Sequence, residues 1–241
     1  MLKRYCFYIA AIALNILSVH AQRTNNIRSL PAISPEAMGV SSAGIIGFLN
    51  AVHQSSKYEL HSFTLLRHGR LIAKGAWKPY RAELKHTLYS TTKCFTSTAV
   101  GFAIAEGKLK LSDKAITFFP ESLPDTVIVY WQQLTIKHLL TMTGGLDTEP
   151  DIITGDNWIK AALACPLTYV PGTRFFYNNT GPFLLSAIVQ KVTGKTMFDY
   201  LTPRLFKPLG ITTADWQMNP QGINLGGWGL RLNTRDMAKL G

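Results

Sequence analysis

Apolar residues recur at helical spacing over most of this 241-residue chain. A first helix is predicted to end at about Gln54, and either Ser41 or Ser42 can cap its start. The apolar residues on one face of this helix are Ile45, Ile46, Leu49 and Val52. The same spacing predicts five helices farther along: Ser90–Ala105, Leu134–Met142, Trp158–Ala164, Pro182–Val192 and Met197–Leu205. Asn233 is the expected cap of a last helix, Thr234–Leu240.

Patterns typical of strands are fewer. Leu60–Arg67 and Leu71–Trp77 flank a short glycine-containing turn, which predicts an antiparallel hairpin. Residues 222–232 are rich in glycine and then β-like, and a short strand is expected at Gly229–Arg231. An isolated hairpin is marginally stable and leaves both edges open. We therefore expect that the strands completing this sheet are missing from the sequence.

The first 21 residues have the pattern of a signal peptide. Lys3 and Arg4 precede the apolar run Tyr5–Val19, and Val19-His20-Ala21 is a small-x-small cleavage signature before Gln22. The run is shorter than the roughly 20 apolar residues that span a bilayer. These features predict an exported protein, periplasmic or secreted, with no stable membrane anchor after signal cleavage.

The composition excludes several classes of protein. Hydrophobic residues make up 46% of the chain and charged residues 16%, which excludes an intrinsically disordered protein. Three cysteines are too few for a disulfide-stapled scaffold, and we expect Cys94 and Cys165 to be buried free thiols, although an exported protein offers the conditions to pair them. The net charge is +11, but the basic residues do not cluster with aromatic ones, so no nucleic-acid partner is expected.

A Ser-x-x-Lys tetrad, Ser90-Thr91-Thr92-Lys93, stands at the start of a predicted helix. This spacing places Ser90 and Lys93 on one helix face, and the helix N-terminus favours negative charge on the serine oxygen. A desolvated lysine beside a serine can lose its proton near neutral pH and act as a base. Chance alone gives roughly 0.8 such tetrads in a chain of this composition, so the position before an apolar helix carries the argument.

Tyr177-Asn178-Asn179 places a phenol and an amide two residues apart, so that both point the same way in an extended segment or turn. A tyrosine near a lysine can pass a proton to a leaving group, and an amide can hold a substrate carbonyl. Chance gives about 0.4 such Tyr-x-Asn triplets. An aromatic turn, Phe175–Tyr177, that packs on the core explains the same residues equally well.

Other chemical motifs are absent from the sequence. There is no Gly-x-Ser-x-Gly elbow, which argues against an α/β-hydrolase. The six histidines are scattered without ligand spacing, so we expect no catalytic metal and no cofactor. Gly194-Lys195-Thr196 imitates the end of a phosphate loop, but Val189 stands where the first glycine is required.

Four stretches together resemble the serine β-lactamase-like hydrolases, which include class C β-lactamases, D,D-peptidases, related esterases and 6-aminohexanoate-dimer hydrolases. They are Leu88–Lys114, Leu134–Leu146, Val170–Gly194 and Gly226–Gly241. Ser90 and Tyr177 are 87 residues apart, which fits the usual separation in that superfamily. The resemblance runs from about Ile33 to the last residue, and the middle of the chain looks closest to the branch of 6-aminohexanoate-dimer hydrolases and β-lactamase-like esterases.

The resemblance implies a role for each motif residue. Ser90 is the expected acylated nucleophile and Lys93 the base that activates it. Tyr177 is the expected proton shuttle to the leaving group, and Asn179 the residue that binds the substrate amide. The Ser90 backbone N–H is expected to form half of an oxyanion hole.

The resemblance also implies the fold, α/β plus all-α: an antiparallel sheet flanked by helices, with a helical domain and the site at their junction. After the signal peptide, 1–21, we expect the N-terminal part of the α/β domain over 22–83. The helical domain with both motifs is expected over 84–205. Residues 206–241 are expected to return toward the α/β domain and to leave it incomplete.

One departure from the family pattern affects the oxyanion hole. The family carries a Lys-Thr-Gly or His-x-Gly-like triplet on a C-terminal strand, and no such triplet occurs here in the corresponding place. Losing an oxyanion donor typically costs about 10²–10³ in rate. We therefore interpret the sequence as a family member truncated at its C-terminus, a genuine short variant being the alternative.

The sequence accordingly predicts an exported serine hydrolase that cleaves an amide or ester bond through a Ser90 acyl-enzyme. β-Lactams are among the candidate substrates. The expected partner is a small-molecule or peptide-like substrate. Two alternatives remain open: a non-catalytic penicillin- or peptide-binding module, and an inactive fragment that lacks the third motif.

Overall fold

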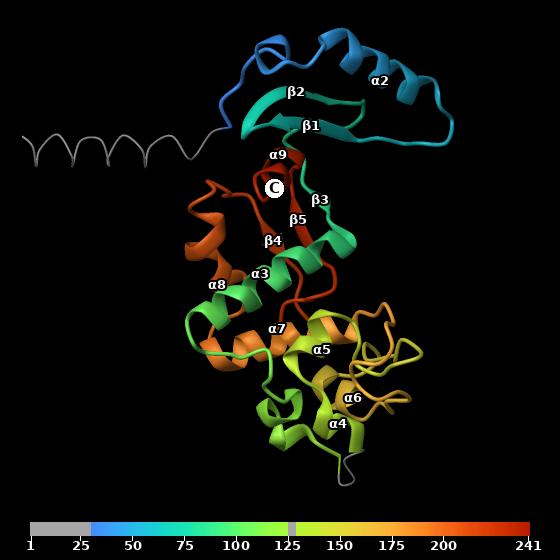
Figure 1. Ribbon diagram of the computed structural model, residues 1–241, viewed down its shortest axis with the longest axis vertical. Helices are drawn as coiled ribbons and strands as arrows, with labels where there is room; N and C mark the ends of the chain where they lie inside the picture. Colours follow the sequence, from blue (N-terminus) through green and yellow to red (C-terminus); the bar gives the residue numbers. More distant parts are fainter. Residues whose placement is uncertain (1–29, 125–128) are drawn as a thin grey trace, which may run out of the picture. The chain divides into compact units, whose positions relative to one another are not determined.

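The computed structural model describes residues 30–124 and 129–241 (Figure 1). They fall into two compact units. The first holds the chain up to Leu84, together with Leu205–Thr212 and Asn233–Gly241; the second holds Lys85–Arg204 and Thr213–Leu232. The predicted signal peptide, 1–21, lies outside the described residues. Thr213–Leu232, which the sequence analysis grouped with the return to the α/β domain, belongs to the second unit.

The first unit contains the predicted helix and hairpin. Helix α2, Ser42–Gln54, begins at Ser41, whose hydroxyl accepts a hydrogen bond from the Gly44 N–H at 3.3 Å. Strands β1, Ser62–Arg67, and β2, Arg70–Ala76, pair antiparallel around a turn at His68 and Gly69. Both turn residues have positive φ, a conformation that glycine adopts without cost. These elements confirm the helix and hairpin predictions.

Two further segments extend the first unit. Residues near Ala32 run parallel to β2, with the Ile33 N–H donating to the Leu71 carbonyl at 3.0 Å. Helix α9, Thr234–Ala238, packs against β1, and Ser62 and Thr234 share a hydroxyl–hydroxyl hydrogen bond. Asn233 caps α9 by accepting from the Asp236 N–H at 2.8 Å, as its sequence predicts.

The second unit is mainly helical, and α7, Thr180–Thr193, is its central helix. Ten consecutive residues of α7, Thr180–Val189, are buried, because neighbours cover the helix on all sides. Helix α3, Thr92–Ala105, packs on α7 and is longer than the other neighbouring helices. The shorter helices are α4 at Val129–Gln133, α5 at Ile136–Leu140, α6 at Trp158–Leu163 and α8 at Met197–Leu201, and a π-helical turn follows at Thr202–Phe206.

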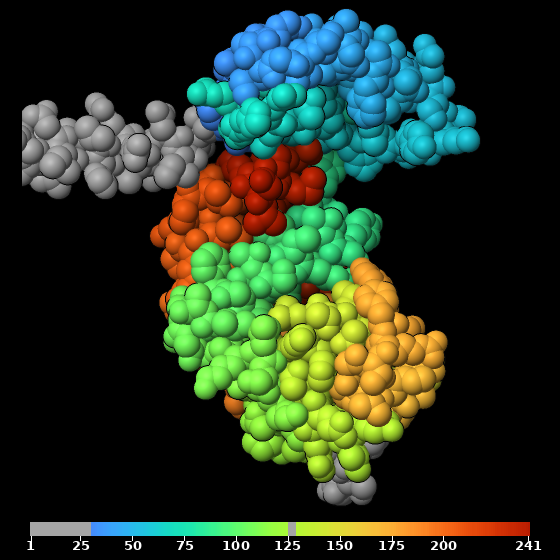
Figure 2. Space-filling view, viewed as in Figure 1, coloured from blue at the N-terminus to red at the C-terminus, as the bar shows by residue number. Residues whose placement is uncertain are grey.

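Two long irregular segments interrupt these helices, at 141–157 and 164–179. Glycine and proline are frequent in both segments and favour turns over helix. Figure 2 shows the yellow and orange parts of the second unit, which include these segments, side by side on one face. The second predicted motif, Tyr177–Asn179, lies at the end of the second segment.

A small antiparallel sheet in the second unit joins segments far apart in sequence. Its order is β3 at His86–Thr87, β5 at Leu230–Leu232 and β4 at Asp215–Trp216. Strand β5 confirms the strand expected near residue 230, whereas β3 and β4 were not predicted, because two residues are too short to show alternation. Asp215 forms ion pairs with Lys85 and Arg231 on this sheet.

Within the described residues, no helix combines the length and apolar character needed to cross a membrane. Both described cysteines are free thiols. The expectation that both are buried is wrong for Cys94, which is exposed on α3, and Cys165 is only partly buried. Apolar α3 positions such as Phe95 and Ala99 face the core instead, which turns their neighbour Cys94 outward.

Candidate active site

Ser90 lies in a 3₁₀ turn, Tyr89–Thr91, that leads directly into α3. The predicted helix therefore begins slightly later than expected, with its α-helical part starting at Thr92. Tyr89 has a φ of 45° and is 74% exposed. A non-glycine residue in this left-handed region is strained, and such strain clusters at functional sites.

Lys93 occupies the centre of a hydrogen-bond network. Its Nζ lies 3.1 Å from Ser90 Oγ, 2.8 Å from Asn179 Oδ1 and 2.8 Å from the Gly227 carbonyl oxygen. These partners come from the start of α3, the start of α7 and the loop before β5. A long flexible amine held by three oxygens has one defined position beside the serine.

Tyr177 and Asn179 reach the same point from the segment that enters α7. The Tyr177 hydroxyl donates to Ser90 Oγ at 2.6 Å, and Lys93 Nζ lies 4.9 Å from the centre of the tyrosine ring. Tyr177 remains 50% exposed, so the aromatic turn does not pack its ring into the core. The structure thus brings together all four residues that the sequence selected, Ser90, Lys93, Tyr177 and Asn179.

The neighbours of Tyr177 lower the pKa of its hydroxyl group. The hydrogen bond with Ser90 lowers the pKa of Tyr177, and the hydrogen bond and positive charge of Lys93 act in the same direction. Partial burial and the negative charge of Glu149 oppose this shift without reversing it. A phenol with a lowered pKa beside a serine and a lysine is suited to proton transfer.

Gly226 and Gly227 complete the wall behind Lys93. A Cβ on Gly226 would stand 1.9 Å from the Pro182 carbonyl oxygen, and a Cβ on Gly227 2.9 Å from Asn179 Oδ1. Thr96 also donates to the Gly226 carbonyl at 2.7 Å, which fixes this segment against α3. The glycine-rich composition of 222–232 is visible in the sequence, but no local pattern marks Gly226 and Gly227 as part of a site.

Glu149 is a second residue that the sequence analysis missed. Its carboxylate accepts from the Asn179 N–H at 2.5 Å, the Thr180 N–H at 3.1 Å and the Thr180 hydroxyl at 2.7 Å. Glu149 lies 30 residues before Asn179 in an irregular segment. No local pattern marks such a contact, and an alignment of relatives is the signal that would reveal it.

The backbone N–H of Ser90 is the expected oxyanion donor. Among residues 30–124 and 129–241, the structure gives the Ser90 N–H no hydrogen-bond acceptor. A backbone N–H next to the nucleophile and free of other partners is available to a developing oxyanion. Within the same residues no cluster of three or more histidine, cysteine or acidic side chains is arranged to hold a metal.

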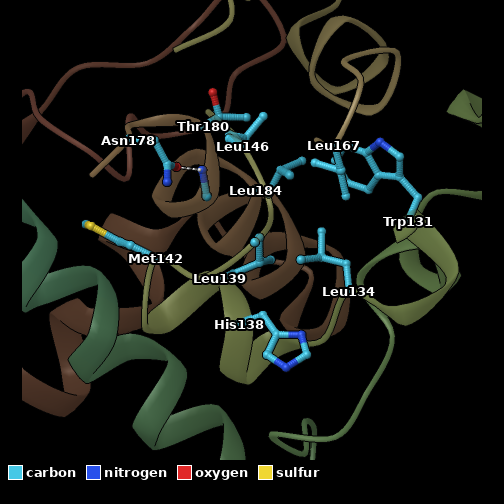
Figure 3. A pocket seen from close by; sticks show the side chains of 12 residues that line it. Trp131, Leu134, His138, Leu139, Met142, Leu146, Leu167, Asn178, Thr180 and Leu184 are labelled. Atoms are coloured by element: carbon cyan, nitrogen blue, oxygen red, sulfur yellow. Dashed lines mark hydrogen bonds between the residues drawn. The ribbon is translucent and has the colours of Figure 1, made fainter. Parts of the chain in front are cut away.

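A separate cavity is lined by residues of α4, α5 and α7 and of the segments between them, and five of its twelve lining residues are leucines (Figure 3). Leu134, Leu139, Leu167 and Leu184 line it, with Asn178 and His138 at its margin. Its volume is about 20 Å³, the room that one water molecule needs. None of the four site residues lines it, and a space of this size is too small for an amide or ester substrate.

Solved structures identify the class of fold. The octameric penicillin-binding protein homologue from Pyrococcus abyssi superposes with a TM-score of 0.66 at 23% identity, over 83% of this chain and 55% of that one. For the beta-lactamase/D-alanine carboxypeptidase from Pseudomonas syringae the TM-score is 0.65 at 20% identity, over 83% and 64%. At these identities the likeness shows the fold alone. That fold is the β-lactamase/transpeptidase-like fold, as the sequence predicts.

The family follows from the sequence match. The family model described as Beta-lactamase matches residues 61–241, and the chain therefore belongs to the β-lactamase family. The beta-lactamase of Escherichia coli (strain K12) is 27% identical over 157 residues. That match covers 64% of this chain and 41% of the relative, so the chain spans less than half of the relative's length.

Proposed function

We propose that this protein is a serine hydrolase that works through an acyl-enzyme on Ser90. The proposal rests on the two neighbours of Ser90 Oγ: Lys93 Nζ lies 3.1 Å away and the Tyr177 hydroxyl 2.6 Å away. A hydroxyl between an amine and a phenol has both a base to take its proton and a group to relay that proton. This arrangement lies within the second unit alone.

Only the neutral form of the Lys93 amine can accept the Ser90 proton and start acylation. Two N–H bonds of the amine then point to Asn179 Oδ1 and the Gly227 carbonyl, which leaves the lone pair for the Ser90 hydroxyl proton. Ser90 Oγ forms a bond to the substrate carbonyl carbon, and its proton passes to Lys93. The carbon–oxygen or carbon–nitrogen bond to the leaving group then breaks, and Tyr177 delivers its proton to that group and takes up in its place the proton that Lys93 received from Ser90.

Deacylation reverses these roles with water as the nucleophile. Water attacks the acyl carbon, its proton moves to the Lys93 and Tyr177 pair, and the bond to Ser90 Oγ breaks. The products are a carboxylic acid and the regenerated Ser90 hydroxyl. The Ser90 N–H supports the oxyanion in both steps, and one missing donor typically costs about 10²–10³ in rate.

The substrate class is an amide or ester, and β-lactams are included. The names of the E. coli and P. syringae proteins support this choice, since they describe a beta-lactamase and a D-alanine carboxypeptidase. Both names belong to longer proteins, of which this chain covers a part. Export of the protein, with cleavage before Gln22, belongs to the same proposal and rests on the sequence of residues 1–21.

Steady-state hydrolysis of a chromogenic ester and a chromogenic β-lactam by the full-length protein tests the proposal. We expect turnover that Ser90→Ala abolishes. Ser97→Ala is the matched control, because Ser97 is an exposed serine on the same helix that donates only to the Cys94 carbonyl. Wild-type rates in Ser90→Ala would exclude this mechanism. A single burst without further turnover would favour the binding-module alternative.

A further inference from the structure

The first turn of α7 has an unusual set of hydrogen-bond partners. Asn179 occupies the capping position of this helix, and asparagine is among the strongest N-cap residues. Its side chain nevertheless makes no capping hydrogen bond. Asn179 Oδ1 instead accepts from Lys93 Nζ at 2.8 Å, so the usual capping group is committed to the catalytic network.

The backbone donors at this helix end are satisfied by other residues. Glu149 accepts from the N–H groups of Asn179 and Thr180, and Asn178 Oδ1 accepts from the Gly181 N–H at 2.8 Å. Pro182 has no N–H, and the Phe183 N–H donates to the Asn179 carbonyl at 3.0 Å. Each N–H group from Asn179 to Phe183 therefore has an acceptor, and Glu149 supplies two of them.

We propose that Glu149 is a positioning residue: its carboxylate holds the N–H groups of Asn179 and Thr180, and so fixes the start of α7 in the position from which the Asn179 side chain reaches Lys93. This inference rests on the proposed function, because it assigns the residue that sets up the Lys93 base. A carboxylate also suits the positive end of the helix dipole, which an amide side chain serves less well. Glu149 itself touches neither Ser90 nor Lys93.

Removal of the carboxylate has two expected consequences. The N–H groups of Asn179 and Thr180 lose a charged acceptor, so the start of α7 shifts and the Asn179 side chain moves away from Lys93. The negative charge that raises the pKa of Tyr177 also disappears, while Lys93 continues to lower it. The acylation rate therefore falls, and its high-pH limb, where Tyr177 loses its proton, moves to lower pH.

The test compares variants of the full-length protein by the rate at which a fluorophosphonate probe labels Ser90, measured as a function of pH below the thermal transition. We expect Glu149→Gln to slow labelling by about 10- to 100-fold, the usual effect of misplacing a catalytic group by about 1 Å. Glu149→Asp should recover part of the rate, because it restores the charge and the acceptors. A role in stability alone would lower the melting temperature and leave the pH profile in place.

Asp151→Asn is the matched control. It removes one negative charge from the same segment, where Asp151 accepts only from the nearby Ile153 N–H at 3.2 Å. We expect this variant to keep the wild-type rate and pH profile. A crystal structure of Glu149→Gln should show Asn179 Oδ1 turned away from Lys93 Nζ, a result that does not depend on activity.

The outcomes separate the two proposals. In one outcome the probe labels wild type and Glu149→Gln equally fast, and Asn179 is unmoved in the variant structure. This outcome would overturn the role of Glu149 and leave the proposed hydrolase intact. Wild-type protein that is not labelled at Ser90 would overturn the hydrolase. In that case an unmoved Asn179 in the structure of Glu149→Gln would overturn the positioning role of Glu149 as well.

Discussion

Lys93 is the residue on which the proposed chemistry depends most closely. Its amine lies within hydrogen-bond distance of Ser90, Asn179 and Gly227, and only a neutral amine can take the serine proton. Arginine keeps the positive charge and the donors but stays protonated at all accessible pH values. We expect Lys93→Arg to lower kcat by about 10²–10⁴, the usual contribution of a general base. Activity near the wild-type level would show that Lys93 is not the base.

Gly227 is expected to tolerate no side chain. A Cβ there would meet Asn179 at three atoms, including the backbone Cα at 3.4 Å, so the residue that holds Lys93 must move. We expect Gly227→Ala to lower kcat/KM by about 10- to 100-fold. Gly101→Ala is the control: Gly101 lies in α3 with nothing within 4 Å of an added Cβ. That substitution should leave activity unchanged and stabilise the protein by about 0.5–1 kcal/mol, measured by urea unfolding.

At the scale of residues, the sequence is informative where spacing is local. Ser90 and Lys93 are three apart, and Tyr177 and Asn179 two apart, so each pair can be selected from a short segment. Glu149 and Gly227 join the site only through long-range folding. A carboxylate in an irregular segment and a glycine in a glycine-rich one have no local feature that distinguishes them.

At the scale of elements, α5 carries a pH-sensitive contact. His138 Nδ1 accepts from the Thr135 N–H at 3.4 Å, and Thr135 caps the helix in return. Burial lowers the pKa of His138 below its usual 6.5, and the positive charges of Lys114 and Lys137 lower it further. Because the folded state resists protonation, this contact stabilises the protein above pH 6.5 and loses its effect as the pH falls through the folded pKa.

The measurement is the urea midpoint at pH 7.5 and at pH 5 for wild-type protein and His138→Asn. An asparagine oxygen can accept from the Thr135 N–H at both pH values. We therefore expect wild type to lose more stability than the variant on acidification. Equal losses in both proteins would assign the acid sensitivity to carboxylates elsewhere.

The prediction of elements succeeds where caps and apolar spacing agree. Ser41 and Asn233 mark helix starts that the structure reproduces, because the side chain of each accepts a hydrogen bond from a backbone N–H in the first turn. Strands β3 and β4 could not be predicted. They exist because β5 lies between them, and the pairing of β3 with β5 joins residues more than 100 positions apart.

At the scale of the whole molecule, the arrangement of the helical unit was expected from family resemblance rather than from hydrophobic pattern. Apolar spacing alone predicts α3 and α7 but does not say that they pack together. Their packing brings the two motifs into one site within a single compact unit. The family match over residues 61–241 and the shared fold confirm that resemblance.

The measurement that tests the account most directly is the intact mass of the full-length protein with and without a fluorophosphonate probe. We predict a single covalent adduct that maps to Ser90, forms at the wild-type rate in Ser97→Ala and is absent from Ser90→Ala. Wild-type protein that takes up no adduct, or an adduct that persists in Ser90→Ala, would contradict the assignment of Ser90 as the nucleophile.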